Sequence, residues 1–447
     1  TAMILKTKSP MNTLLRIILI LMPTLIIAAC GSSGSSDTPS AAAANTDMVG
    51  AWSTAPYGPY PLGPLTMETP IGATPGSVTL ALLEKNQARD QSFRMIINPT
   101  ISGSKARIRL SNLKGDRPVR FESVSLSHVL PQSPVLIGER VSLSFGGKSF
   151  VIAQPGTEVI SDTVDFAIKA QEDLAVSFYV AGESGPITWH AISFGPQYIS
   201  PAGSGDVTND MSGLSFLGLS IGWFFISGLD VYNPQSPGAL VAIGDSITDG
   251  SYQVLNQRWT DRLATRLNEA GQHIGILNQG INSNTVTELP EEESFRGSPA
   301  VLRFDRDVLQ RSGVKGVIIF EGTNDLGTGI KAEPVIAGLQ DMIRRARSAG
   351  LCVFVATITP RADVAFGWFP DGPTVKEPER IKINDWIREK APVDGVVDFA
   401  AVLALPGLPA IPNIALYFPD LLHPNPVGFR QMGDAIDIDT LQSKCDL

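Results

Sequence analysis

The sequence predicts an α/β domain built on a parallel sheet, preceded by an all-β region. From about residue 236 onward, near-continuous apolar segments of strand length alternate with helical patterns, as in a parallel sheet covered on both faces. Before that point, short apolar or alternating segments recur between turn residues, and no long helical pattern interrupts them. The chain has 447 residues, 43% of them hydrophobic, which is enough for two domains with apolar cores.

The N-terminal end of the chain differs in composition from the rest. A neutral apolar run, residues 17–29, is too short to span a bilayer but suits the core of a signal peptide. It ends at Cys30 after small residues, which resembles the lipobox of bacterial lipoproteins. We expect a lipoprotein signal peptide at residues 1–29, lipidation at Cys30 and a flexible tether at residues 30–47. This predicts a secreted lipoprotein anchored to a membrane, in the periplasm or outer membrane or at the cell surface. An ordinary secretory signal with a chance Cys is the alternative.

Residues 48–235 are expected to form a β-sandwich domain. In residues 105–110, charged and apolar residues alternate, as in a strand with one apolar face. The Gly146-Gly147 pair suits the turn of a hairpin. The expected strands include residues 106–110, 119–129, 140–145, 149–152, 174–180 and 187–194.

Residues 236–447 are expected to form the α/β domain. The predicted strands are residues 239–245, 273–279, 314–320, 351–358 and 394–399. The predicted helices are residues 258–270, 299–312, 332–349, 377–390 and 426–437. In such a sheet the ligand site lies at the carboxyl ends of the strands. The residues that follow each strand are therefore the candidates for chemistry.

Charge and cysteine content exclude several classes of function. The chain carries 35 Lys and Arg against 44 Asp and Glu, a net charge of -9, so it lacks the attraction to phosphate backbones that a nucleic-acid partner requires. Its three cysteines form no metal-binding or redox motif, and Cys352, in an apolar run, is interpreted as a small buried hydrophobe without a disulfide framework. The sequence shows no ligand cluster for a metal or cofactor, and we expect neither.

Polar residues follow the first two strands of the predicted α/β domain. Ser246 comes directly after the first strand, in a Gly-Asp-Ser sequence, at the edge where backbone N–H groups can stabilise an oxyanion. A capping serine in a turn is the alternative. Gly280 ends the second strand, in Asn-Gln-Gly, and the lack of a side chain lets a backbone N–H point into the site. A plain turn explains this glycine equally well.

Two further segments follow later strands. Asn324, in Gly-Thr-Asn-Asp, ends the third strand, and its amide can donate to an oxyanion or form an Asx turn. His423, in Asp-Leu-Leu-His-Pro-Asn, follows the fifth strand. Asp420, three residues earlier, can bind the ring nitrogen that faces away from a nucleophile. The four segments fall in order at the ends of different strands, on one edge of the sheet.

Together these segments resemble the four sequence blocks of the SGNH/GDSL hydrolases, a family of serine esterases and lipases, over roughly residues 238–440. The resemblance implies a flavodoxin-like, three-layer domain with Ser246 as nucleophile, His423 as base and Asp420 orienting His423. The region before it has Gly50-Ala51-Trp52 near its start and Thr188-Trp189-His190 near its end. With these segments it resembles the jelly-roll-like N-terminal β-sandwich of some bacterial members.

The resemblance also implies the groups of an oxyanion hole. These would be the N–H of Ser246, the N–H of Gly280 and the side chain of Asn324. Ser283 stands where relatives lead us to expect glycine.

The resemblance implies a carboxylic ester hydrolase that needs no cofactor and acts on a small or polymer-borne ester. A carbohydrate acetylesterase, an acyltransferase, and a surface binding lipoprotein with an inactive hydrolase domain are the alternatives. Two loops are expected to form an apolar acyl pocket: residues 361–376, with Phe366, Trp368 and Phe369 as candidate substrate-binding residues, and residues 401–422. Alternatively, these apolar residues pack on one another or on the β-domain.

Overall fold

The computed structural model describes residues 47–63, 69–70, 83–252, 255–289, 295–362 and 372–447. The predicted signal peptide, the lipidation site Cys30 and nearly all of the predicted tether lie outside these residues. Residues 46–447 form one compact unit, so the domain boundary between residues 235 and 236 stays a prediction. In the described part of the chain, no helix is long and apolar enough to cross a membrane.

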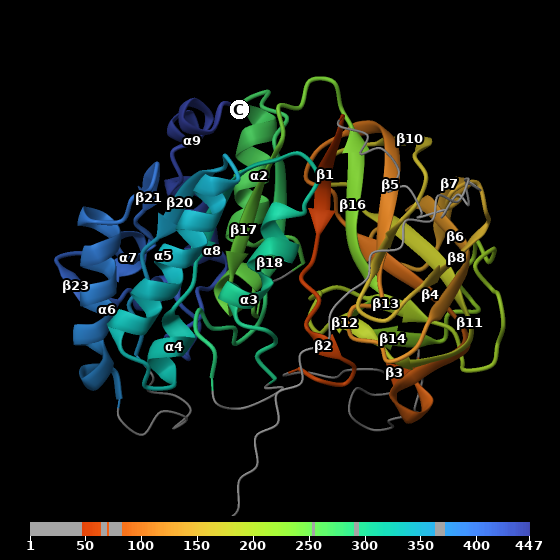
Figure 1. The fold of residues 1–447 in the computed structure, drawn as a ribbon, viewed down its shortest axis with the longest axis horizontal. Helices are drawn as coiled ribbons and strands as arrows, with labels where there is room; N and C mark the ends of the chain where they lie inside the picture. The colour runs from red at the N-terminus through yellow and green to blue at the C-terminus, as the bar shows by residue number, and fades with distance from the viewer. Residues whose placement is uncertain (1–46, 64–68, 71–82, 253–254, 290–294, 363–371) are drawn as a thin grey trace, which may run out of the picture. The chain divides into compact units, whose positions relative to one another are not determined.

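The C-terminal region contains a five-stranded parallel sheet in the order β18–β17–β19–β20–β21 (Figure 1). Its strands are β17 (Ala239–Gly244), β18 (Gly275–Gly280), β19 (Val314–Phe320), β20 (Cys352–Ala356) and β21 (Gly395–Val397). This is the flavodoxin-like strand order, in which β17 lies between the strands that follow it in sequence. The switch point that results leaves a crevice at the carboxyl edge, where ligands bind in such sheets.

Helices cover both faces of this sheet, because successive side chains along a strand point to opposite sides. On β17, Val241 and Ile243 join the apolar cluster of one face, whereas Leu240 and Ala242 join the cluster of the other. The first cluster includes α3 (Ala300–Phe304) and α5 (Ala332–Ser348), and the second includes α2 (Trp259–Glu269), α8 (Pro426–Ala435) and α9 (Ile438–Cys445). The remaining helical segments are α1 (Ser246–Asp249), η2 (Asp305–Leu309), α4 (Thr323–Gly327), α6 (Gly372–Glu389), α7 (Phe399–Leu403) and η3 (Ile414–Leu416).

Apolar periodicity explains why the predicted elements formed where they did. In α5, the buried residues recur at a spacing of three or four, which gives one apolar face. They are Ala332, Val335, Leu339, Met342, Ile343 and Ala346. The predicted strands and long helices of this region agree with the structure to within a few residues, apart from the start of α6. The sequence analysis missed the short helices α1, α4 and α7, the last helix α9, and the hairpin of β22 (Ala404–Leu405) and β23 (Leu408–Pro412).

The N-terminal region consists mostly of antiparallel sheets, as predicted. One sheet has the order β1–β16–β5–β10 with β9 beside β5, a second has β3–β14–β13–β4–β11–β6–β7 with β8 beside β6, and a small third has β15–β12–β2. Their strands are β1 (Met48–Ser53), β2 (Gly58–Pro59), β3 (Thr69–Pro70), β4 (Gln87–Ile97), β5 (Gly103–Ser111), β6 (Val119–Val129), β7 (Leu136–Ser142), β8 (Phe150–Ala153), β9 (Glu158–Ile160), β10 (Val164–Ile168), β11 (Leu174–Pro186), β12 (Thr188–His190), β13 (Gln197–Ile199), β14 (Gly218–Ser220), β15 (Trp223–Phe224) and β16 (Ile226–Tyr232). The core contains Phe93, Phe121, Phe178 and Phe225, whose rings contact one another. Gly146 and Gly147 both have positive φ and form the predicted hairpin turn.

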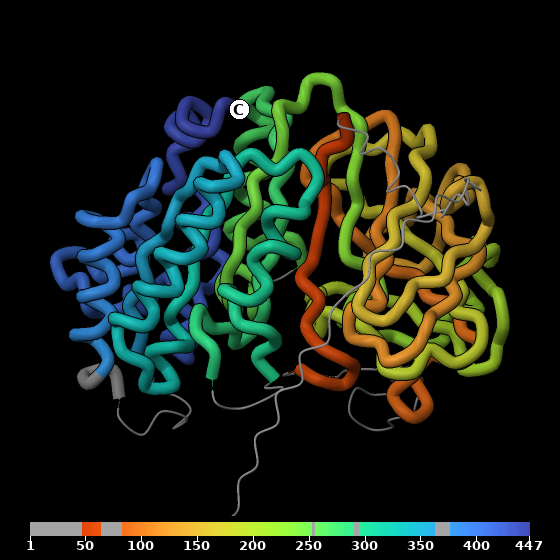
Figure 2. The backbone as a smooth tube through the Cα atoms, in the orientation of Figure 1, coloured from red at the N-terminus to blue at the C-terminus, as the bar shows by residue number. Residues whose placement is uncertain are grey.

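Strand β1 lies where the N-terminal sheets meet the parallel sheet, as the chain path in Figure 2 shows. It pairs with β16 and packs against β18, the edge strand of the parallel sheet. Gly50 and Gly275 allow this approach, because a Cβ on Gly275 would stand 2.1 Å from the carbonyl oxygen of Gly50. Gly50 also donates its N–H to the carbonyl of Ser312 at 2.9 Å. The β18 edge of the parallel sheet is therefore covered by the N-terminal region.

Two cysteines form a disulfide that the sequence analysis did not predict. Cys352 begins β20 and Cys445 ends α9, with their Cα atoms 5.1 Å apart. The interpretation of Cys352 as a buried hydrophobe without a disulfide partner was therefore wrong. The two cysteines are separated by 93 positions in the sequence, and the pairing could not be predicted because α9 was not predicted and nothing in the sequence placed it against β20.

Candidate active site

Ser246 begins α1, the single helical turn that follows β17. The side chain of Asp245 accepts the N–H of Ile247 at 2.9 Å and thereby caps the start of this turn. Gly280, at the end of neighbouring β18, lies against α1, where a Cβ would stand 2.2 Å from the backbone nitrogen of Asp249. The close approach requires glycine at this position and fixes Ser246 at the carboxyl edge of the sheet.

His423 lies between η3 and α8, beside Ser246. The Oγ atom of Ser246 is 2.9 Å from Nε2 of His423, and Nδ1 of His423 is 2.6 Å from Oδ2 of Asp420. Because Nδ1 faces a carboxylate, it carries the ring proton, and Nε2 is left to accept a hydrogen bond from the serine hydroxyl. The structure thus brings the three residues expected to form the triad into one hydrogen-bonded series.

Local hydrogen bonds hold Asp420 in this position. Its Oδ1 accepts the backbone N–H groups of Leu422 and His423, each at 3.1 Å. Burial opposes the ionisation of Asp420, but these hydrogen bonds and the contact with the His423 ring outweigh it and lower the pKa of the carboxyl below its usual value. Asp420 is therefore a carboxylate at neutral pH.

The three groups expected to form an oxyanion hole are engaged differently. The N–H of Ser246 has no acceptor within the described residues. Asn324, at the start of α4, donates through Nδ2 to the carbonyl of Asn284 at 2.8 Å, which leaves the second hydrogen of its amide for a ligand. The N–H of Gly280, in contrast, donates to Oδ1 of Asn278 at 2.9 Å.

The turn after Gly280 offers another donor. The N–H groups of Ile281 and Asn282 donate to the carbonyl of Gly244 at 2.9 Å and to Oδ2 of Asp249 at 3.1 Å. The N–H of Ser283 has no acceptor in the part of the chain that the structure describes. Ser283 has a φ of 64°, in the left-handed region that favours glycine, at the position where the family resemblance led us to expect glycine.

Residues 242–431 match the model of the GDSL-like Lipase/Acylhydrolase family. These residues form a GDSL-type hydrolase domain. The match includes all the residues expected for the triad and the oxyanion hole, and it confirms the family resemblance seen in the sequence. No curated protein matched the chain.

Three solved structures that are similar to this chain each cover less than half of it. A GDSL-like lipase from Bacteroides thetaiotaomicron is 19% identical, with 46% of this chain and 88% of the other covered and a TM-score of 0.34. A carbohydrate acetylesterase from Sinorhizobium meliloti is 18% identical, with 46% and 98% covered and a TM-score of 0.37. An aryl esterase from M. smegmatis is 18% identical, with 46% and 99% covered and a TM-score of 0.37.

Beneath the candidate site of the GDSL domain, a buried arginine binds the ends of two strands. Arg303 on α3 donates to the carbonyl of Gly244 at 3.0 Å and to that of Gln279 at 2.7 Å. These carbonyls precede Asp245 and Gly280, so Arg303 helps to fix both strand ends. Sequence reasoning missed it, because an arginine on an amphipathic helix is usually an exposed residue.

Glu321, which follows β19, lies beside Arg303 in this buried cluster. Its Oε1 is 3.5 Å from Nη2 of Arg303, and its Oε2 has no hydrogen-bond partner among the described residues. Burial and then the nearby Asp245 raise the pKa of Glu321 well above its usual value, and burial raises the pKa of Asp245 to about 7. The folded GDSL domain therefore retains protons that the unfolded chain releases.

Because the folded state holds these protons, we expect the free energy of unfolding to fall as pH rises. A carboxyl whose pKa is higher in the folded state stabilises the fold fully below its unfolded pKa, and this contribution is lost as pH rises through the folded pKa, at up to about 1.4 kcal/mol per pH unit. We expect the melting temperature to fall between about pH 5 and 8, and less steeply in Glu321→Gln, which cannot ionise. The exposed Glu333 provides the control Glu333→Gln, which should keep the wild-type slope. Equal slopes in Glu321→Gln and wild type would contradict this account.

One aromatic residue, Tyr252, contacts the histidine of the GDSL domain, and a second, Phe418, contacts Tyr252. The Tyr252 ring meets the His423 ring edge to face, with centroids 5.0 Å apart, and contacts Phe418 at 5.8 Å. Tyr252 is 57% exposed and has a φ of 65°, which is unusual for a bulky residue. Phe418 belongs to the predicted loop 401–422, but Tyr252 was not anticipated.

The other residues that were expected to line the acyl pocket fall into three groups: outside the described residues, exposed, or buried in the core. Phe366, Trp368 and Phe369 lie outside the described residues. Within loop 401–422, some apolar side chains are exposed and others lie in the core. The exposed ones are Leu405, Leu408, Ile411 and Ile414, and the buried ones are Leu403, Leu416 and Tyr417.

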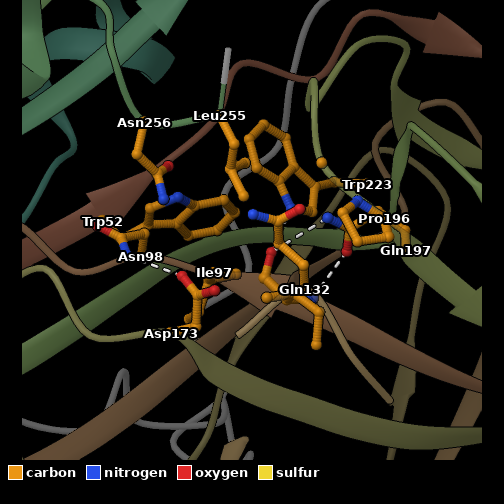
Figure 3. A pocket seen from close by; sticks show the side chains of 12 residues that line it. Trp52, Ile97, Asn98, Gln132, Asp173, Pro196, Gln197, Trp223, Leu255 and Asn256 are labelled. Atoms are coloured by element: carbon orange, nitrogen blue, oxygen red, sulfur yellow. Dashed lines mark hydrogen bonds between the residues drawn. The ribbon is translucent and has the colours of Figure 1, made fainter. Parts of the chain in front are cut away.

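A pocket also lies beside the GDSL domain, on the β-region. Figure 3 shows Trp52, Trp223 and Gln197 around it, together with Leu255 and Asn256 from the loop that leads to α2. None of the triad candidates lines this pocket. Among the described residues, no group of three or more His, Cys, Asp or Glu is arranged to hold a metal ion.

Proposed function

We propose that this protein is a serine esterase that hydrolyses carboxylic esters. The observation that carries the proposal is the hydrogen-bonded series from Ser246 through His423 to Asp420. A hydroxyl bound to a neutral imidazole, which is itself held by a buried carboxylate, is the arrangement that activates serine for acyl transfer. Its place in a GDSL-type hydrolase domain supports the same reading.

In the proposed reaction, Ser246 Oγ attacks the ester carbonyl carbon while its proton passes to Nε2 of His423. The histidine gives this proton to the leaving alcohol oxygen, and an acyl–serine ester remains. Water then attacks the acyl–enzyme, with His423 first taking and then returning a proton, so that acid and Ser246 are released. Asp420 stays ionised and stabilises the imidazolium in both halves.

The carbonyl oxygen becomes negatively charged in each half of the reaction and needs donors that are not already engaged. The N–H of Ser246 and the second hydrogen on Nδ2 of Asn324 meet this requirement. We propose the N–H of Ser283 as the third donor, in place of the expected Gly280, because the N–H of Gly280 already binds Asn278. Gly280 instead provides the space in which α1 packs.

The acyl group of the substrate is proposed to be apolar. Tyr252 and Phe418 support this, since they place aromatic surface beside His423, and substrate sites are mostly apolar around a few polar groups. An acetylated carbohydrate is the second candidate for the same chemistry.

The proposal is tested by labelling and by a substrate panel. A p-nitrophenyl alkylphosphonate should inactivate the full-length protein, and mass spectrometry should find the phosphonyl group on Ser246. Values of kcat/KM should be higher for butyrate and benzoate esters than for acetylated xylose. A labelled residue elsewhere would contradict the nucleophile, whereas a preference for acetylated xylose would favour the carbohydrate esterase.

The protein is also proposed to be exported and anchored through lipid on Cys30. The apolar run that ends at Cys30 supports this, and so does the Cys352–Cys445 disulfide, because disulfides persist in oxidising compartments. We expect mass spectrometry of the membrane fraction to find an acylated Cys30 as the first residue. A soluble mature form that begins elsewhere would contradict the anchor.

A further inference from the structure

The β-region sends two buried side chains to the turn that follows β18. Tyr57, shortly after β1, donates its hydroxyl to the carbonyl of Asn282 at 2.6 Å and is only 1% exposed. His190, in β12, lies 3.0 Å through Nε2 from Oδ1 of Asp249, the last residue of α1. Both contacts cross from the β-region to the GDSL domain, and both end within a few residues of the proposed oxyanion donors.

The Tyr57 contact acts on a specific peptide group. The carbonyl of Asn282 and the N–H of Ser283 belong to the same peptide bond. In a planar trans peptide these two groups point in opposite directions, so a hydrogen bond that fixes the carbonyl also fixes the direction of the N–H. Burial, and then the nearby Asp249, raise the pKa of Tyr57 well above its usual value, so the phenol keeps the proton that it donates.

The His190 contact fixes the preceding peptide group. Nδ1 of His190 binds the carbonyl of Ala55 at 2.7 Å, and the ring lies between Tyr57 and Trp223, with centroid distances of 6.1 and 5.7 Å. The ring therefore holds Asp249 in one orientation. The second oxygen of Asp249 accepts the N–H of Asn282 at 3.1 Å.

These contacts also hold Ser283 in its left-handed backbone conformation. A non-glycine residue in this region costs free energy and persists where the surrounding structure determines it. Tyr57 and the His190–Asp249 pair bind the peptide groups just ahead of Ser283. Arg296 donates to the Ser283 carbonyl at 3.2 Å on the other side.

We propose that Tyr57 and His190 are positioning residues that aim the Ser283 N–H at the oxyanion, so that the β-region completes the catalytic centre of the GDSL domain. The inference rests on the proposed esterase function. It assigns the β-region a part in the chemical step rather than in the choice of substrate.

The test compares two buried tyrosines in the full-length protein. Tyr57→Phe removes only the hydroxyl that binds Asn282. Tyr198→Phe removes a hydroxyl that donates to the backbone carbonyl of Gln132 at 2.9 Å, in a separate apolar cluster of the β-region. Both variants lose one hydrogen bond of the same type and should show similar, small falls in melting temperature.

The two variants should differ in catalysis. We expect Tyr57→Phe to lower kcat by about tenfold with KM within about twofold of wild type, because oxyanion contacts act mainly in the transition state. Tyr198→Phe should keep the wild-type kcat. Rates are normalised to the number of sites titrated by the phosphonate, so that misfolded protein does not count. Phosphonylation of Ser246 should slow by a factor similar to that for kcat, since the phosphonyl oxygen uses the same donors.

A second pair of variants tests His190. His190→Gln retains an N–H donor for Asp249 and should keep most of the activity, whereas His190→Leu should lower kcat by at least tenfold. Equal kcat in the two tyrosine variants, or a rise in KM alone for Tyr57→Phe, would overturn the inference. The variant Ser246→Ala distinguishes failure of the proposed esterase function from failure of the positioning role. Activity that survives Ser246→Ala would contradict the esterase function. An inactive Ser246→Ala together with an unaffected Tyr57→Phe would contradict only the positioning role.

Discussion

Replacement of Ser246 by alanine is expected to lower kcat for ester hydrolysis by about four to six powers of ten. The variant keeps the oxyanion donors but has no oxygen that can attack the ester and no hydroxyl from which His423 can take a proton. His423→Ala should have an effect of similar size, because the serine then lacks its base. The double variant should be little worse than either single one, because the two residues act as a unit.

Steady-state kinetics with a nitrophenyl butyrate, together with thermal unfolding, check this expectation. Ser443, exposed on α9, provides the control variant Ser443→Ala, which should keep wild-type kcat. If Ser246→Ala retained more than about a tenth of the wild-type kcat, the nucleophile would have to be another residue.

Replacement of Asp420 by asparagine is expected to lower kcat by about three to four powers of ten near neutral pH. An asparagine can present its NH₂ group to Nδ1 of His423, which moves the ring proton to Nε2 and leaves no acceptor for the Ser246 hydroxyl. The carboxylate also stabilises the imidazolium, and the neutral amide does not. Because the pKa of Asp420 is lowered, the wild-type protein keeps this charge throughout the neutral range.

Measurement of kcat between pH 5 and 10 distinguishes this role from simple loss of structure. The melting temperature of Asp420→Asn should stay near that of wild type, since Oδ1 of asparagine can still accept the N–H groups of Leu422 and His423. Asp439→Asn, on the exposed surface of α9, is the matched control. A change confined to KM in Asp420→Asn would assign the residue to substrate binding instead.

The parallel sheet, and the placement of the candidate triad residues at its carboxyl edge, were predictable from the sequence because local patterns determine both. Apolar strands such as β17 and β19 stand out against their amphipathic helices, and all parallel strands end at one edge. Ser246, Asn324 and His423 could therefore be expected at the same edge from their positions after strands, before any contact was known. Asp420 could also be predicted, because it precedes His423 by only three residues.

The features of the fold and the site that could not be predicted depend on contacts between residues far apart in the chain. Tyr57, His190 and Arg303 reach the site from an irregular segment, a short strand and a helix, and the sequence patterns of these segments do not indicate what the three side chains contact. The Cys352–Cys445 disulfide belongs to the same class. Gly280 shows a different limit, since the sequence indicates that glycine is needed but not whether for an exposed N–H or for the close approach of α1.

The position of β1 also has a consequence for the way the chain folds. Met48–Ser53 are synthesised long before the segments that they contact, because β1 pairs with Ile226–Tyr232 and packs on Gly275–Gly280. The strand cannot reach its native partners until more than half of the chain exists. Such long sequence separations slow folding, because the intervening chain must be ordered before the contacts form. Until then the edge of β18 is uncovered, so partly made or partly unfolded chains expose a strand edge open to pairing with other chains.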